Sequence, residues 1–97
     1  MIKSFFDQGT EDIFDRRVSR EARRACPKNI WPVAQRKLDQ LNAVVSLNSL
    51  RLPPGNRLES LKQVRYGQHS IRINDQFRVC FIWTEDGPEH VEITDYH

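Results

Sequence analysis

The stretch Phe77-Arg78-Val79-Cys80-Phe81-Ile82-Trp83-Thr84 decides the fold, because large apolar residues occupy every second position in it. Side chains along a β-strand point alternately to opposite faces of the sheet, so the apolar set shares one face and Arg78 lies on the other. The pattern predicts a central strand whose apolar face packs against the core.

Turn signals on either side of this strand predict an antiparallel meander. Asn74-Asp75 favours a hairpin turn before the strand, and Glu85-Asp86-Gly87-Pro88 favours a turn after it. Further strands are expected at residues 60–64 and 68–73 and around Val91 and Ile93. If these registers hold, the sheet face turned away from the core presents Arg72, Arg78 and Tyr96 together.

Upstream of the sheet the sequence predicts helices. Trp31, Ala34, Leu38, Leu41 and Val45 recur at intervals of three and four, which predicts a helix over 29–45 with one buried face. A shorter helix is expected over 9–17, with Thr10 as its cap. Residues 2–6 read as an edge strand, and the prolines and glycine of 47–56 predict a loop. The predicted fold class is α+β, with two N-terminal helices packed on one face of a small twisted, mainly antiparallel sheet, in a single domain of residues 1–97.

Composition narrows the class of protein. The chain has 97 residues, of which 38% are hydrophobic and 29% charged, and no apolar run approaches the roughly 18 residues of a membrane span. The apolar start meets Asp7 too early for a signal peptide, so a cytoplasmic protein is expected. Cys26 and Cys80 have neither metal-type nor C-x-x-C spacing, and we expect both to be reduced structural thiols.

Charge is distributed unevenly along the chain. Residues 1–83 contain all 15 Lys and Arg and 8 of the acids, whereas residues 84–97 contain 5 acids and no Lys or Arg. A basic body suits a phosphate-rich partner and equally an acidic protein. The arginines of residues 16–28 are interpreted first as a solvated connector and second as an RNA or ribosome contact; they are Arg16, Arg17, Arg20, Arg23 and Arg24.

Several motifs together resemble the HigB branch of the RelE-type bacterial toxins. They are Met1-Ile2-Lys3-Ser4-Phe5, Arg36-Lys37-Leu38, the run from Pro53 to Glu59, the run from Gly67 to Arg78, and the terminal Asp95-Tyr96-His97. The resemblance implies a RelE-like fold and an enzyme that binds the ribosomal A site and cuts mRNA there without a metal or other cofactor. It also implies a cognate HigA-like antitoxin, operator DNA bound only through that antitoxin, and no membrane partner.

The resemblance carries the family's catalytic positions onto Asp95, Tyr96, His97, Arg78 and Lys62. In that assignment His97 acts as acid or base, and the two cations hold the scissile phosphate. Tyr96 stacks on a base or donates its hydroxyl, and Asp95 orients His97 or receives a proton. Some family members have a histidine just ahead of the lysine-bearing strand. Here the nearest counterpart is Glu59, which leaves the general base open.

Other interpretations of the same residues remain. A terminal histidine is often only exposed, a strand arginine often only solvated, and Arg57 and Arg72 serve either as RNA or ribosome contacts or as partners of the acidic tail. A zinc site made of Cys80, His90, Asp95 and His97 fits no finger-like spacing and is not expected. The alternative function is a non-catalytic module that binds the ribosome or an antitoxin and blocks translation without cutting RNA.

Overall fold

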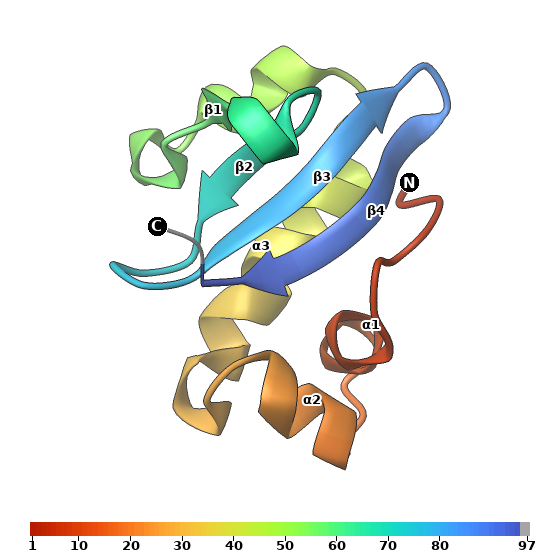
Figure 1. The fold of residues 1–97 in the computed structure, drawn as a ribbon, viewed down its shortest axis with the longest axis vertical. Helices are drawn as coiled ribbons and strands as arrows, with labels where there is room; N and C mark the ends of the chain where they lie inside the picture. The colour runs from red at the N-terminus through yellow and green to blue at the C-terminus, as the bar shows by residue number, and fades with distance from the viewer. Residues whose placement is uncertain (96–97) are drawn as a thin grey trace.

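The computed structural model describes residues 1–95. Its α-helices are α1 (Gln8–Phe14), α2 (Arg20–Ala25) and α3 (Trp31–Ala43), and its strands are β1 (Glu59–Ser60), β2 (His69–Arg72), β3 (Arg78–Thr84) and β4 (Gly87–Thr94). Short 3-10 helices are η1 (Lys28–Ile30), η2 (Leu47–Arg51), η3 (Pro54–Asn56) and η4 (Gln63–Arg65). The strands form one antiparallel sheet in the order β1-β2-β3-β4, with α3 behind it and α1 and α2 at one end (Figure 1).

Helix α3 confirms the periodicity in the sequence. Trp31, Ala34, Leu38 and Leu41 are all buried and belong to the core that the helix shares with the sheet. Pro32 lies in the first turn, where its missing N–H costs no hydrogen bond. The helix ends at Ala43, two residues before the predicted end, and Val45 is exposed.

Helix α1 begins earlier and is shorter than predicted. Its cap is Asp7, whose carboxylate accepts a hydrogen bond of 2.7 Å from the Thr10 backbone N–H, so the prediction of Thr10 as cap is wrong. Thr10 is buried instead, and its hydroxyl accepts the Ile93 N–H of β4 at 3.0 Å. The helix ends at Phe14, because Arg16 has a left-handed φ of 60°.

The basic connector contains a helix that the sequence pattern did not predict. Ser19 caps α2 by accepting the Ala22 N–H at 2.9 Å, and its own hydroxyl donates to the buried Asp12 of α1 at 2.6 Å. Ala22 is the one buried residue in the six of α2, too few for a periodic signal. Three α-helices therefore occupy residues 8–43, and they follow an N-terminal segment instead of opening the chain.

The central strand lies where it was predicted. Val79 and Phe81 of β3 are fully buried, and Arg72 of β2 pairs with Arg78 of β3. The β3–β4 turn is tighter than expected: Thr84 already pairs with Gly87, so only residues 85–86 form the turn. The predicted N-terminal strand is reduced to a single parallel bridge between Phe5 and Val91.

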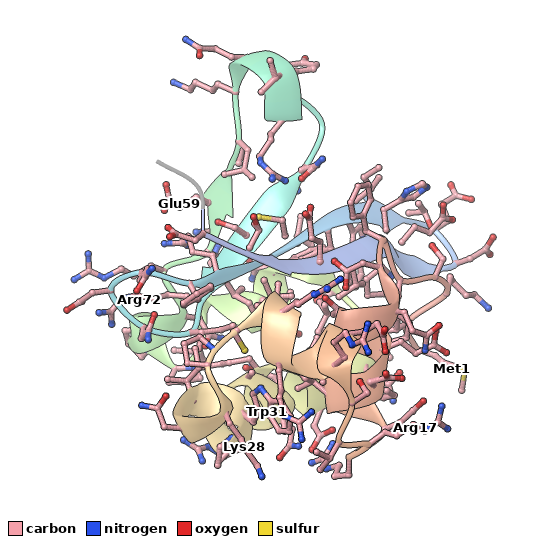
Figure 2. The ribbon with its side chains drawn as sticks, turned by 60° about the horizontal axis from the view of Figure 1, so that its bottom comes forward. Met1, Arg17, Lys28, Trp31, Glu59 and Arg72 are labelled. Atoms are coloured by element: carbon pink, nitrogen blue, oxygen red, sulfur yellow. The ribbon has the colours of Figure 1, made fainter. Side chains whose placement is uncertain are left out.

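The predicted strand at 60–64 is mostly absent. β1 ends at Ser60, and the chain then forms the turn η4, in which Val64 is fully exposed. Residues 61–68, named the arm here, stand away from the sheet on the side opposite the helices (Figure 2). Arg65 ties the arm back to the sheet through an ion pair of 3.2 Å with Glu92 of β4.

Candidate phosphate-binding site

The site is organised around Arg78 at the start of β3. Its Nε donates to the Ser70 hydroxyl at 2.8 Å and one Nη donates to the Arg57 carbonyl at 2.7 Å. Its other Nη lies 3.1 Å from a carboxylate oxygen of Glu59. The side chain is 14% exposed, so the guanidinium is fixed from three sides.

Three different segments supply these contacts. Ser70 is a fully buried residue of β2, which pairs with β3, and Glu59 comes from β1 at the sheet edge. Arg57 follows the 3-10 turn η3 with a left-handed φ of 47°, and this bend turns its carbonyl toward Arg78. The fold rather than local sequence therefore brings Glu59 to Arg78.

A hollow of about 390 Å³ opens beside Arg78. Its lining contains three arginines, two carboxylates and two amide side chains: Arg57, Arg72, Arg78, Glu59, Asp75, Asn74 and Gln76. Arg72 forms an ion pair with Asp75, whose side chain is almost fully exposed. Planar guanidinium groups grouped in this way suit a phosphodiester, which each of them can bind at two points.

Asp95 lies at the margin of this hollow. Its carboxylate accepts a hydrogen bond of 2.9 Å from the Gln76 side chain, which belongs to the hollow's lining. The register of β3 with β4 pairs Arg78 with Thr94, directly before Asp95. The predicted residues Tyr96 and His97 lie outside the described residues. Strand β4 therefore ends beside the start of β3, where Arg78 lies.

Lys62 is placed differently from the prediction. It was expected on a strand, but it lies in the arm just before η4, where it is exposed. It is not among the residues that line the hollow beside Arg78. The strand prediction failed because β1 contains only two residues before the chain turns.

The arginines of the connector lie apart from Arg78. Arg16 forms two hydrogen bonds to Asp39 of α3, at 3.0 and 2.7 Å, and Arg17 is 3.7 Å from Asp12. Figure 2 shows Arg17 at the opposite end of the molecule from Glu59 and Arg72. Arg20, Arg23 and Arg24 are exposed on α2, and Arg24 lines a separate hollow together with Asp95. None of these arginines lines the hollow that contains Arg57, Arg72 and Arg78.

Cys26, Cys80 and His69 have structural surroundings. Cys26 and Cys80 are free and buried, as predicted, and burial raises the pKa of each thiol to about 11. His69 stacks on Phe81 with ring centroids 6.2 Å apart, and burial lowers the pKa of its imidazole. Within residues 1–95 no three His, Cys, Asp or Glu side chains are grouped so that they could hold a metal ion.

Sequence reasoning missed the contribution of Ser70 and the contact between Glu59 and Arg78. Ser70 carried a weak signal, because it lies two residues from Arg72 and shares that residue's strand face. Glu59 was noted only as a departure from a family pattern. Its approach to Arg78 depends on the β1–β2 pairing, which no local pattern predicts.

The fold is shared with a solved structure. A chain described as "YoeB-YefM complex from Staphylococcus aureus" matches with a TM-score of 0.60 and 15% identity, covering 100% of this chain and 98% of that one. At this level of identity the match establishes the fold alone. None of the helices in residues 1–95 is long and apolar enough to cross a membrane.

Sequence comparison defines the family. The model of the HigB-like toxins, described as "RelE-like toxin of type II toxin-antitoxin system HigB", matches residues 3–97. Toxin HigB-1 of Vibrio cholerae serotype O1 is 35% identical over 85 residues, covering 88% of this chain and 86% of that protein. An uncharacterized protein of Haemophilus influenzae is 42% identical over 55 residues, covering 57% of this chain and 54% of that protein. The chain belongs to the HigB-like family of RelE-like toxins of type II toxin–antitoxin systems.

Proposed function

We propose that this toxin is a metal-independent endoribonuclease that cuts mRNA in the ribosomal A site. The observation that supports the proposal is the held guanidinium of Arg78, with Arg57 and Arg72 lining the same hollow. A phosphodiester that is cut gains negative charge in the transition state. Fixed positive groups stabilise that charge without having to reorganise, and in many enzymes this effect supplies most of the rate enhancement.

In the proposed reaction the 2′-hydroxyl oxygen attacks the adjacent phosphorus. A P–O bond forms to the 2′-oxygen, the bond to the 5′-oxygen of the next nucleotide breaks, and a 2′,3′-cyclic phosphate is left on the upstream fragment. The proton of the 2′-hydroxyl goes to a base, and the leaving 5′-oxygen takes a proton from an acid. Arg78 binds the non-bridging oxygens of the phosphate throughout.

Glu59 is our candidate for the base. Its carboxylate lies 3.1 Å from Arg78, so a phosphate bound to that arginine displaces the carboxylate and leaves it next to the nucleotide. Unlike an arginine, a free carboxylate can accept the hydroxyl proton. His97 is then assigned to protonate the leaving oxygen, Asp95 to orient His97, Tyr96 to stack on a base, and Lys62 to a second phosphate contact. These four roles rest on the family resemblance.

The partners and the compartment of the toxin follow from the same proposed reaction. The toxin acts in the cytoplasm on ribosome-bound message, a HigA-like antitoxin keeps it inactive, and operator DNA is bound only through that antitoxin. Ribosome dependence fits a protein with few acid–base groups, because holding the 2′-hydroxyl in line with the leaving oxygen can lower the barrier by ~7 kcal/mol or more.

The test is translation of a defined message in vitro with purified protein, with 5′ ends mapped by primer extension in the presence and absence of ribosomes. We expect cleavage with ribosomes, and a loss of at least about 100-fold for Arg78→Ala, because one donor to a developing oxyanion is worth that much. His97→Ala and Glu59→Gln should also lose cleavage. Lys28→Ala is the control, because Lys28 lies far from Glu59 and Arg72 (Figure 2).

Two results would overturn the proposal. If Arg78→Ala and His97→Ala cut as the parent does, the assigned residues do not perform the chemistry. If translation is blocked while full-length message survives in every reaction, the protein is a binding inhibitor and not a nuclease. In that case growth arrest would persist without any new 5′ ends.

A further inference from the structure

A second hollow holds positive charge on the other side of Arg72. It measures about 400 Å³ and lies between α3 and the segment 53–55. Arg36, Lys37 and Arg72 contribute its charged side chains, and Gln40, Pro53 and Gly55 are among its other lining residues. No carboxylate lines it, in contrast to the hollow beside Arg78, which contains Glu59 and Asp75.

The cations of this hollow are close enough to act on one another. Partial burial lowers the pKa of Lys37 most, and the positive charges of Arg36 and Arg72 lower it further. Neither Arg36 nor Lys37 forms an ion pair with a carboxylate of residues 1–95. Arg72 is paired with Asp75, whereas Arg36 and Lys37 keep a local excess of positive charge that an external anion can neutralise.

Lys37 is held in place within this group. Its ammonium donates to the side-chain oxygen of the buried Asn56 at 2.5 Å, which uses one of its three N–H donors. Two donors remain for a ligand. Arg36 is exposed one residue earlier on the same helix, and Arg72 lies at the end of β2 (Figure 2). Two cations from α3 and one from β2 therefore line the same hollow.

Arg72 connects the two hollows. It lines both of them, and it is directly paired with Arg78 across β2 and β3. Directly paired residues in an antiparallel sheet have Cα atoms about 5 Å apart and side chains on the same face. A polyanion bound at Arg78 that continues past Arg72 therefore reaches Lys37 and Arg36.

We infer that Arg36, Lys37 and Arg72 form a subsite for an RNA phosphodiester beyond the one held by Arg78. The inference rests on the proposed function, because it places the subsite along the same nucleic-acid path. The RNA backbone belongs either to the message or to ribosomal RNA, since both present the same phosphodiester. An acidic protein segment is less suited, because Arg72 lines both hollows and so places these cations directly beside the hollow assigned to the scissile phosphate.

The deciding variant is Arg36→Gln, because Arg36 is exposed and no intramolecular hydrogen bond or ion pair within residues 1–95 depends on it. The control is Lys28→Gln, which removes the same charge from the segment before α3, at the bottom of the view in Figure 2 and away from Arg72. Lys37→Gln is a second variant. Loss of its bond to Asn56 can lower stability, so its melting temperature is measured beside each binding curve.

Binding is measured with a 2′-O-methyl RNA oligonucleotide that cannot be cut, by fluorescence anisotropy at several salt concentrations. Sedimentation with ribosomes follows, with and without message in the A site. We expect Arg36→Gln to weaken binding about three- to tenfold and to reduce the slope of log K against log salt by about 1, whatever the RNA sequence. Lys28→Gln should match the parent.

The two sources of RNA give different supporting results. Weaker binding to ribosomes without message would assign the subsite to ribosomal RNA, and weaker binding only with message present would assign it to mRNA. Arg36→Gln binding RNA and ribosomes like the parent, with an unchanged salt slope, would overturn the inference. So would a loss confined to binding of a purified antitoxin, because the surface would then be a protein-docking site.

The readout is independent of cleavage, so the two proposals can fail separately. If the parent cuts no message but Arg36→Gln still weakens RNA binding, the nuclease proposal fails and the subsite stands. If the parent cuts message and Arg36→Gln binds and cuts as the parent does, only the subsite is wrong.

Discussion

Replacing Asn56 by alanine should destabilise the protein more than any exposed substitution, because this side chain holds the segment that leads to the site against α3. Asn56 is fully buried, and its amide nitrogen has three acceptors within hydrogen-bond distance: Gln40 Oε1 at 2.9 Å, the Leu50 carbonyl at 3.1 Å and the Leu52 carbonyl at 3.2 Å. Its oxygen accepts from Lys37 at 2.5 Å. One side chain therefore joins α3 to the turn η3.

The magnitude follows from which partners lose access to water. The Leu52 carbonyl keeps a hydrogen bond of 2.6 Å from the Gln40 side chain, but Leu50 is buried and its carbonyl would stay unpaired. A buried group without its partner costs about 1 to 3 kcal/mol, and the bonds to Gln40 and Lys37 add about 1 kcal/mol more between them. We expect a loss of ~3 kcal/mol, which for a domain near this size corresponds to a fall in Tm of about 12 to 24 °C.

The assay is thermal unfolding followed by circular dichroism, with Asn29→Ala as the matched control. Asn29 is exposed on η1, so its substitution should change stability by at most about 0.5 kcal/mol. The reasoning is refuted if Asn56→Ala lowers Tm by no more than Asn29→Ala does. A large loss should also relax the Arg57 carbonyl that holds Arg78, because Arg57 is the next residue.

Two further predictions concern helix packing and pH. A Cβ at Gly9 would lie 2.3 Å from the backbone oxygen of Glu21, so Gly9→Ala should lower the free energy of unfolding in denaturant by about 1 to 3 kcal/mol. The control Gly55→Ala, whose added Cβ meets nothing within 4 Å, should cost far less. Equal costs would contradict the close packing of α1 on α2. Burial lowers the pKa of His69 below its ordinary 6.5, so the unfolded chain binds more protons and the free energy of unfolding should fall as pH drops below 6.5. The variant His69→Phe should lose less stability between pH 7.5 and 5.5 than the parent does. An identical loss in both proteins would show that another group is responsible.

The parts of the fold that the sequence predicts are those with a long repeating pattern. The alternation around Val79 and Phe81 identifies the central strand, and the spacing of Trp31, Leu38 and Leu41 identifies α3. Both patterns arise because one face of each element meets the core along its whole length. The family resemblance adds what periodicity cannot, namely the class of protein.

The elements that sequence reasoning missed are short and are held by single contacts. Helix α2 depends on Ser19, which joins its first turn to Asp12 of α1. The sequence of α2 has no apolar periodicity that would predict a helix. The start of α1 depends on a choice between Asp7 and Thr10 as cap. Thr10 loses because its hydroxyl is engaged by β4, a contact 83 residues away in the sequence.

The candidate site divides along the same line. Arg78 was predictable, because strand alternation places it on the face away from the core. The pairing of Arg78 with Glu59 was not predictable, because the two residues lie on strands that are not neighbours in the sheet. The direction of the Glu59 side chain is set by the turn after η3 and by the β1–β2 register. Local patterns report which face a residue occupies and carry no information on what reaches it from another segment.

Under the proposed function, the pairing of Arg78 with Glu59 favours action on RNA that a large assembly holds in place. In the free protein the guanidinium is already satisfied by an internal carboxylate, so a single RNA phosphate exchanges one anion for another and gains little. Binding becomes favourable only if Arg72, Lys37 and Arg36 contact further phosphates at the same time. Within residues 1–95, Lys37 and Arg36 have no carboxylate partner that competes with RNA, and Arg72 has only Asp75. A ribosome that holds the message in one extended geometry presents those phosphates together, whereas a free flexible strand must lose entropy to do so. In the proposed reaction this exchange frees Glu59 only when RNA is in place, which couples the release of the candidate base to correct binding of the substrate.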